Sequence, residues 1–355
     1  MSTLFVLPSL CPAFEKAKGI LLQYGRNSMA WKILEPGMRL WFARHQDCVI
    51  GYQLYKGTRV VAGAPAARPE SLSAVIREFE DEADSRGEKV CYFGAEAWLK
   101  DILRQSPAHK AVLLGAQPVW NPQQWGEALS ERASLRELIN GAVRRGVRVK
   151  EVMLQDIQTD PEYQACLEEW TGKRRMPELG FLLGEKLHPG SYGCRVFAAF
   201  MEGRVMAYAV AAPVPARGGW MIDRVVRRKK TARGTSELLI HEMMNLFAGE
   251  GAVYATLGLA PLSLRAGLSY QLNPGWMRAF FRWLYFKGAR FYSFNGLDFF
   301  KAKFNPQKWE PVYAIVNRPR FSFRTLYHVA GVFCRMPPLF FFITALGRNF
   351  FEFLE

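Results

Sequence analysis

The sequence predicts an α/β protein built from two similar halves. The chain has 355 residues, which is more than one compact core usually holds. Half of the residues are apolar and 22% are charged, a composition typical of globular proteins. Each half contains a hairpin, a helix and further strands. We therefore expect two domains, 1–155 and 156–318, followed by an apolar amphipathic tail, 319–355.

In the first half, apolar runs are separated by residues that favour turns. A turn at Lys56-Gly57 closes the predicted hairpin. Ser71 is a candidate N-cap for the helix that follows, and Gly87 comes after its end. The predicted elements are strands over 47–55 and 58–65, a helix over 69–87 and a buried strand over 89–95.

A further helix, 134–146, has an apolar stripe and a basic face. The stripe follows the i, i+3, i+4, i+7, i+8 pattern and consists of Leu135, Leu138, Ile139, Ala142 and Val143. The basic residues lie away from it, with few acidic partners, and are Arg132, Arg136, Arg144 and Arg145. They form either a solvated face or a face that contacts phosphates.

The second half repeats the order of elements. Its hairpin, 194–214, turns at Glu202-Gly203, and a basic loop at 227–234 leads into a helix that starts at Thr235. The remaining predicted elements are strands over 218–226, 252–260 and 310–317 and an aromatic helix over 275–288.

The tail after residue 318 is rich in Phe and Leu, with interspersed arginines. It is predicted to form amphipathic helices around Pro337-Pro338. Such a segment either docks on its own domain or anchors at a membrane interface, because aromatic and basic residues suit the headgroup boundary.

The charge and the cysteine pattern restrict the function. A net charge of +15 favours polyanions, either nucleic acid or an anionic membrane surface, although a generally basic soluble protein is the alternative. The six cysteines contain no CxxC pair and only five histidines are present. We therefore expect no metal site, no disulfide framework and no cofactor.

Targeting signals are weak. The N-terminus lacks the basic region of a secretion signal, and no uncharged apolar run reaches the roughly 18 residues that span a bilayer. We expect a cytoplasmic protein.

The loop and helix start at 227–240, RRKKTARGTSELLI, predict an anion site, since free backbone N–H groups and the helix dipole attract negative charge. In GNAT acyltransferases this place holds the coenzyme A pyrophosphate, but the pattern here is degenerate, with Lys229, Ala232 and Gly234. The alternative is an ordinary capped helix in which Glu237 completes a capping box. No GxSxG, HExxH or Walker loop is present, so an enzyme here would use an already activated donor.

Several motifs, in order, resemble the C-terminal catalytic domain of the lysylphosphatidylglycerol synthases, the multiple peptide resistance factor family. The similarity spans roughly residues 20 to 317. The motifs are YGRNSMAWKIL (24–34), GAPAARPE (63–70), SLRELINGAVRRG (134–146), ELGFLLG (178–184), DRVVRRKKTARGTSELLI (223–240), TLGLAPLS (256–263) and FNGLDFFKAKFNPQKWEPVY (294–313).

This resemblance implies a fold of tandem GNAT-like domains, each a mixed β-sheet flanked by helices. It implies transfer of an amino acid from aminoacyl-tRNA to the hydroxyl of a membrane lipid such as phosphatidylglycerol. The expected partners are aminoacyl-tRNA, an anionic membrane lipid and the inner surface of the cell membrane, where the protein would be peripheral. The basic face formed by Arg132, Arg136, Arg144 and Arg145 would then bind the tRNA. We expect a stand-alone form without the family's transmembrane flippase region.

The resemblance also points to catalytic residues. Attack on the ester builds negative charge on oxygen, which a fixed cation would stabilise. Lys303 is the candidate, although Lys301 could point either way and a surface lysine is the alternative. Asp223 would act as base or hold the donor's amino group, and Arg227 would orient that carboxylate or bind the lipid phosphate. The alternative is an Asp–Arg ion pair without chemistry.

Three more residues are candidates for substrate binding. Glu237 would hold the donor's amino group, while Ser263 and Asn295 would line the pocket. Two other functions stay open. One is a GNAT-type transferase that uses aminoacyl-tRNA or acyl-CoA with a soluble amine, peptide or small-molecule acceptor. The other is a non-catalytic module that binds membrane or nucleic acid.

Overall fold

The computed structural model describes residues 12–172, 193–287 and 293–334. The strands in this part are β1 (Arg39–Phe42), β2 (Cys48–Tyr55), β3 (Thr58–Ala62), β4 (Ala66–Ala67), β5 (Lys89–Glu96), β6 (Lys110–Trp120), β7 (Arg148–Val152), β8 (Arg195–Met201), β9 (Arg204–Val214), β10 (Gly219–Arg227), β11 (Tyr254–Thr256), β12 (Ala260–Pro261) and β13 (Lys308–Val316). The α-helices are α1 (Pro12–Tyr24), α2 (Leu72–Ser85), α3 (Ala97–Leu103), α4 (Trp125–Ser130), α5 (Ala133–Arg144), α6 (Leu154–Thr159), α7 (Pro161–Thr171), α8 (Thr235–Gly249), α9 (Gly275–Lys287), α10 (Phe294–Ala302) and α11 (Phe323–Cys334).

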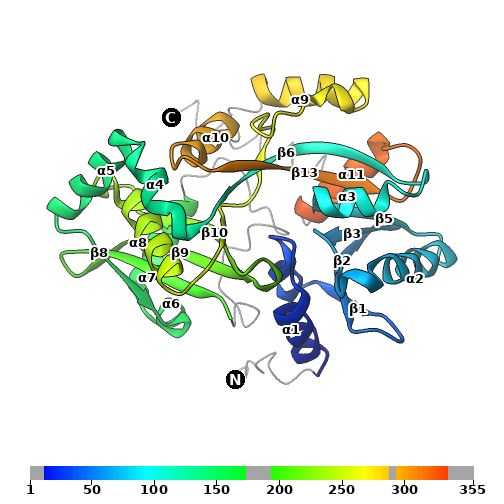
Figure 1. Cartoon of the computed structure of the whole chain (residues 1–355), viewed down its shortest axis with the longest axis horizontal. Coiled ribbons are helices and arrows are strands. Elements are labelled where there is room, and N and C mark those ends of the chain that lie inside the picture. The colour runs from blue at the N-terminus through cyan, green and yellow to red at the C-terminus, as the bar shows by residue number, and fades with distance from the viewer. Residues whose placement is uncertain (1–11, 173–192, 288–292, 335–355) are drawn as a thin grey trace.

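One mixed sheet runs through both halves in the order β1-β2-β3-β5-β13-β6-β11-β10-β9-β8-β7. β13, the last strand in sequence, lies between β5 and β6 of the first half and pairs antiparallel with both. β6 in turn pairs with β11 of the second half. Figure 1 shows the two halves side by side, with β6 and β13 running between them. The expected boundaries after residues 155 and 318 remain a prediction.

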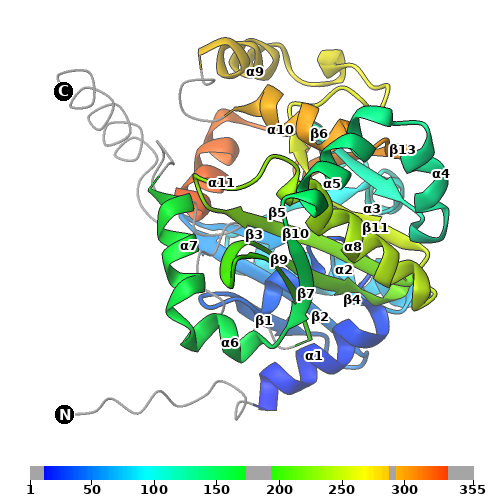
Figure 2. The ribbon, with the colours of Figure 1, turned by 90° about the vertical axis from the view of Figure 1, so that its left-hand side faces the viewer.

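Helices cover both faces of the sheet because successive strand residues point to opposite sides. On β8 and β9, Phe197 and Ala209 pack in the cluster that contains Leu239 of α8. Their neighbours face the cluster that contains Tyr163 of α7. Figure 2 shows α7 and α8 on opposite sides of these strands. In the first half, α2 and α3 cover one face, and α1 and α11 cover the other.

The predicted α/β class and both hairpins are confirmed. β2 and β3 meet at Tyr55 and Thr58, and β8 and β9 meet at Met201 and Arg204. The helix expected over 134–146 is α5. Val143 was predicted to belong to its apolar stripe, but it is 42% exposed near the end of the helix.

Ser71 occupies the N-cap position of α2, as predicted, but neither this cap nor the alternative cap of the helix after residue 234 forms a side-chain hydrogen bond. The Ser71 hydroxyl donates to the Arg68 carbonyl and makes no capping hydrogen bond with α2. Before α8 the N-cap residue is Gly234, which has a left-handed φ of 96° and no side chain to cap with. Glu237 pairs instead with Lys303, so the expected capping box does not form.

The described part of the tail docks on the protein itself. Val329 and Val332 of α11 are buried, and His328 Nδ1 lies 2.8 Å from Thr58 Oγ1 on β3. Pro337-Pro338 and the motif at 178–184 lie outside the described residues. Across the described ranges, no helix is long and apolar enough to cross a membrane.

Candidate active site

The candidate site lies where β10 and β11 separate. The two strands pair in parallel only from Gly219 and Tyr254 to Met221 and Thr256. β10 then continues to Arg227, and its pairing with β9 is interrupted by a bulge at Asp223. A bulge adds an unpaired residue to a strand and can re-aim its side chain.

Asp223 sits in a buried cluster of charges. Its Oδ2 is 2.5 Å from Lys32 Nζ and 3.8 Å from Arg224 Nη2. Lys32 Nζ also contacts Glu35 at 2.8 Å. Burial lowers the pKa of Lys32, but the carboxylates of Asp223 and Glu35 outweigh it, so the net shift raises the pKa. Lys32 is therefore a cation at neutral pH and holds Asp223 in place.

Lys301 reaches toward the same region from α10. It is 5% exposed, and its Nζ donates to the carbonyl oxygens of Gly258 and Leu259 at 2.8 and 2.7 Å. Burial lowers the pKa of Lys301 to about 7, although the carboxylates of Asp223 and Asp298 act in the opposite direction. A lysine that titrates near neutral pH can exchange a proton during a reaction.

Lys303 has different surroundings. It forms an ion pair with Glu237 of α8, and its Nζ lies 4.3 Å from the centre of the Phe300 ring. Its side chain is 31% exposed. The structure thus joins two of the predicted residues, Lys303 and Glu237, and brings Asp223 into electrostatic contact with Lys301 instead.

The arginine beside Asp223 is Arg224, which is 8% exposed. Arg227 is exposed at the end of β10. Arg228 is buried and pairs with Glu162 and Glu169 of α7.

A pocket of about 610 Å³ is formed by the loop after β11, by α9 and by the start of α10. Ser263 and Asn295, both predicted to line a pocket, lie in its wall. So does Asp298, which pairs with Arg265 at 2.7 Å and contributes to the field on Lys301. The rest of the wall combines arginines with apolar and aromatic side chains, including Leu264, Arg278, Phe281, Arg282 and Phe286.

The predicted tRNA-binding arginines lie on α5 and at its ends. Arg132 donates to Asn305 Oδ1 at 3.0 Å and Arg145 to the Gly141 carbonyl at 3.1 Å. Arg136 is half-buried and donates to the Leu129 carbonyl. Arg132, Arg144 and Arg145 are exposed.

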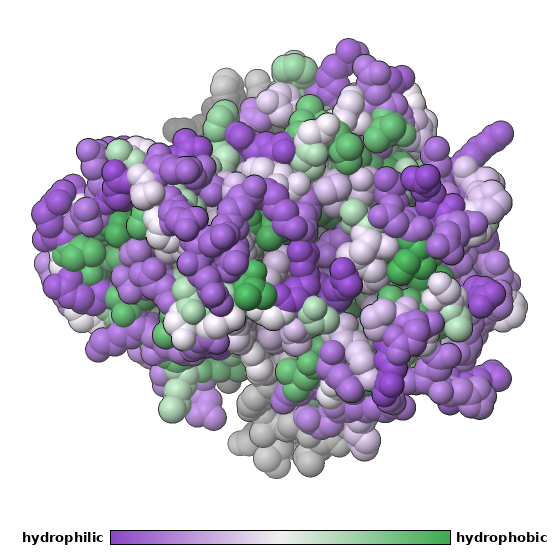
Figure 3. All heavy atoms as spheres, viewed as in Figure 1, coloured by the Kyte–Doolittle hydropathy of each residue, from purple (hydrophilic) through white to green (hydrophobic). Residues whose placement is uncertain are grey.

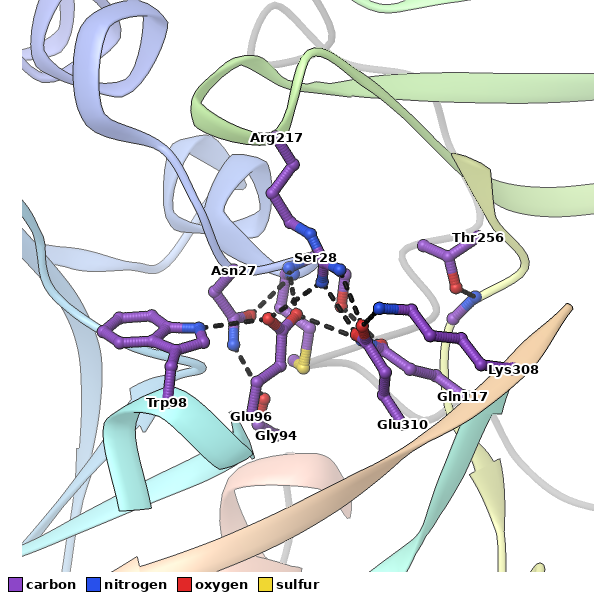
Figure 4. A network of polar contacts seen from close by, with 12 residues as sticks. Asn27, Ser28, Gly94, Glu96, Trp98, Gln117, Arg217, Thr256, Lys308 and Glu310 are labelled. Atoms are coloured by element: carbon purple, nitrogen blue, oxygen red, sulfur yellow. Dashed lines mark hydrogen bonds and ion pairs between the residues drawn. The ribbon is translucent and has the colours of Figure 1, made fainter. Parts of the chain in front are cut away.

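The sequence analysis missed a buried polar network that holds the segment carrying Lys32 (Figure 4). Arg217 makes two hydrogen bonds to Glu310, at 2.7 and 2.8 Å, and contacts Glu96 at 3.3 Å. Glu96 accepts from the backbone N–H of Ser28 at 2.9 Å. Burial raises the pKa of Glu310, but Arg217 and Lys308 outweigh it and bring the pKa to about 2.

This network joins β5, β13, the turn before β10 and the segment at 27–28. Lys32 follows four residues later in a 3-10 helix, Ala30–Leu34. The motif at 24–34 was the available signal, although only the fold pairs Lys32 with Asp223. Within the described residues, no group of three or more His, Cys, Asp or Glu side chains could hold a metal.

Comparison with known proteins gives one family. Residues 18–316 match the family described as phosphatidylglycerol lysyltransferase, C-terminal. Phosphatidylglycerol lysyltransferase of Bacillus subtilis (strain 168) is 24% identical over 321 residues, which cover 89% of this chain and 36% of that protein. The lysylphosphatidylglycerol biosynthesis bifunctional protein LysX of Mycolicibacterium gilvum is 24% identical over 85% of this chain and 28% of its own length. The chain thus spans only about a third of these relatives.

Two solved structures share the fold. L-PGS from Bacillus licheniformis aligns with a TM-score of 0.73 and 23% identity, covering 90% of this chain and 96% of that one. A C-terminal domain from Agrobacterium fabrum aligns with a TM-score of 0.74, 21% identity and the same coverage. The predicted α/β fold class, with a mixed β-sheet flanked by helices, is confirmed and is shared with these two structures.

Proposed function

The chain belongs to the phosphatidylglycerol lysyltransferase C-terminal family, and we propose that it moves an amino acid from aminoacyl-tRNA to the hydroxyl of phosphatidylglycerol or a similar anionic lipid. The observation that carries this proposal is Lys301, a buried lysine that donates to two backbone carbonyls, has a pKa of about 7 and lies in the field of Asp223 and of Asp298 in the pocket wall. The family and its relatives' names support the lipid acceptor, whereas tRNA as donor rests on the sequence resemblance and the basic face of α5.

The surroundings of Lys301 suit a general base. A neutral amine has two N–H donors and one lone pair. The carbonyls of Gly258 and Leu259 accept two hydrogen bonds from Nζ, which leaves the lone pair for an incoming proton. Because the pKa is about 7, the neutral form is well populated at physiological pH.

We infer the following transfer. The lipid hydroxyl gives its proton to Lys301, and its oxygen forms a bond to the ester carbonyl carbon. The bond from that carbon to the ribose oxygen then breaks, and the ribose oxygen takes the proton back from Lys301. The cations Lys32 and Arg224 would stabilise the negative charge on the carbonyl oxygen. Asp223 holds both cations in position.

The remaining predicted roles remain proposals. Glu237 would hold the amino group of the donor residue, and Lys303 would supply the stabilising cation in place of Lys32. Arg227, exposed at the end of β10, would bind phosphate. Ser263 and Asn295 would contact the lipid in the pocket. The exposed arginines Arg132, Arg144 and Arg145 would bind the tRNA backbone, with Arg136 beside them.

The test is a transfer assay with purified protein, phosphatidylglycerol vesicles and radiolabelled aminoacyl-tRNA. We expect label in the extracted lipid, and RNase treatment of the tRNA should remove it. Lys301→Met should reduce the rate by about 10² or more, the contribution typical of a general base. Lys303→Met is the matched control, because Lys303 lies two residues after Lys301 at the same end of α10.

The outcomes separate the candidates. A large loss in Lys303→Met with little change in Lys301→Met would assign the catalytic cation to Lys303. If the protein deacylates the tRNA faster than the reaction without protein, but no label enters the lipid, the acceptor is a soluble molecule. No turnover with any donor would contradict the enzyme and favour a binding module.

A further inference from the structure

One helix, α9, presents large apolar side chains to solvent. Its inner side is anchored by Met277 and Phe281, which are 0% and 8% exposed. On its outer side, Trp283 is 49%, Tyr285 40% and Phe286 69% exposed. We call these three residues the aromatic face of α9. Figure 1 places the helix at the edge of the molecule, and Figure 3 shows hydrophobic and hydrophilic residues side by side there.

The aromatic face is held by its own contacts. The Trp283 ring stacks on Phe280 with centres 6.0 Å apart, and Tyr285 packs edge-on against Phe286 at 5.4 Å. The patch continues onto Leu264, which is 53% exposed and shares the pocket wall with Phe286. A soluble protein rarely leaves such a group exposed unless a partner covers it.

The charged side chains that α9 exposes are basic. Arg278 and Arg282 are exposed on the helix, and Arg265 lies in the pocket wall beside it. The sequence from residue 251 to residue 297 contains no Asp or Glu, while it contains five Lys or Arg residues. Asp298 in the pocket wall is paired with Arg265, so Arg278 and Arg282 leave a positive charge that attracts an anionic partner. A second copy of this chain would bring like charges together and is disfavoured.

Aromatic side chains beside arginine suit the headgroup boundary of a bilayer, where an apolar ring and a charged group are both satisfied. A nucleic acid could also use arginine and aromatic rings. The bilayer is favoured because the aromatic face adjoins aliphatic Leu264 and a pocket whose wall contains Asp298, a carboxylate that acts on the charge of Lys301.

We propose that the aromatic face of α9 inserts at the headgroup boundary of an anionic bilayer and presents the adjoining pocket to the lipid. This proposal rests on the proposed function for its purpose, since the lipid acceptor resides in the bilayer. Arg278 and Arg282 would contact lipid phosphates, while Trp283 and Phe286 would enter the apolar boundary.

The binding test uses the full chain and sedimentation with vesicles. We expect binding to phosphatidylglycerol–phosphatidylcholine vesicles to exceed binding to phosphatidylcholine vesicles. Trp283→Ser and Phe286→Ser should each lower the bound fraction at least about 5-fold, because each removes apolar surface at the interface. Leu22→Ser is the matched control, since Leu22 is 51% exposed on α1, and it should bind as the wild type does.

A transfer test separates this proposal from the proposed function. Short-chain phosphatidylglycerol, dissolved as monomers, reaches the site without a bilayer. Trp283→Ser should keep wild-type transfer to this soluble lipid and lose transfer to vesicles. If the wild type transfers to neither form while vesicle binding depends on Trp283, the proposed function fails and the membrane face stands.

Two results would overturn the proposal. One is vesicle binding by Trp283→Ser and Phe286→Ser equal to that of the wild type. The other is weaker tRNA binding by these variants with unchanged vesicle binding, which would assign the face to nucleic acid.

Discussion

Lys301 and Lys303 lie two residues apart and yet meet opposite environments. Two residues on a helix turn a side chain to the other side, so one lysine faces buried carbonyls and the other faces Glu237. The aromatic residues Phe300 and Phe304 flank Lys303. The sequence alone could not show which lysine is desolvated. The desolvation of Lys301 depends on the loop after β11, whose carbonyl oxygens it contacts.

The pKa of Lys301 has a consequence for stability. Burial lowers this pKa to about 7, whereas a lysine in an unfolded chain titrates near about 10.4. Between the two values the unfolded state binds more protons than the folded state. Stability is therefore greatest above the unfolded pKa and falls as the pH drops to the folded pKa.

We expect the free energy of unfolding of the wild type to rise from about pH 7 to about pH 9 relative to that of Lys301→Met. Urea titrations at several pH values measure this difference. Lys303→Met, partly exposed, is the control and should follow the wild type. Parallel curves for wild type and Lys301→Met would contradict a buried lysine that loses its charge.

The two ends of α8 show how a helix depends on its neighbours. Gly234 begins it with φ 96° and Gly251 follows it with φ 81°. A Cβ at Gly234 would overlap the backbone carbonyl of Leu138 on α5, whereas a Cβ at Gly251 would meet nothing within 4 Å. Close approach of α5 and α8 therefore requires glycine at residue 234.

Gly234→Ala should lower the free energy of unfolding by about 3 kcal/mol or more, since backbone strain adds to a clash with main-chain atoms. Gly251→Ala should lower the free energy of unfolding by only about 1 kcal/mol, because it has the same backbone strain but its added Cβ meets no other atom. Urea unfolding of both variants gives the comparison. Equal costs would mean that α5 moves freely away from α8.

The bulge in β10 is the other element that decides the site. In a regular strand Asp223 and Arg224 would face opposite sides of the sheet. The extra residue changes this alternation, and Arg224 approaches Asp223 within 3.8 Å. The sequence analysis named Arg227 as the partner of Asp223. It could not point to Arg224, because a bulge leaves no clear sequence signal.

At the scale of the whole molecule, β13 ties the halves together. It fills the gap between β5 and β6, so residues 1–155 alone would leave one edge of β5 and both edges of β6 unpaired, because β11 is absent as well. We expect this fragment to lack a cooperative unfolding transition, whereas the full chain should unfold cooperatively. Circular dichroism during urea unfolding makes the comparison.

A control fragment adds residues 308–318 through a flexible linker and should regain part of the transition, because it restores the missing strand. Cooperative unfolding of residues 1–155 alone would instead support an autonomous domain that ends at residue 155.

The sequence by itself determined the α/β class, both hairpins, the amphipathic α5 and the family, because hydrophobic periodicity, turn residues and ordered motifs are local properties of the chain. Only the tertiary structure decided that Lys32 meets Asp223, 191 residues away, and that Lys301 is desolvated. Burial and ion pairing depend on which distant segments come into contact. Here those contacts are determined by the bulge in β10, the separation of β10 from β11 and the central position of β13.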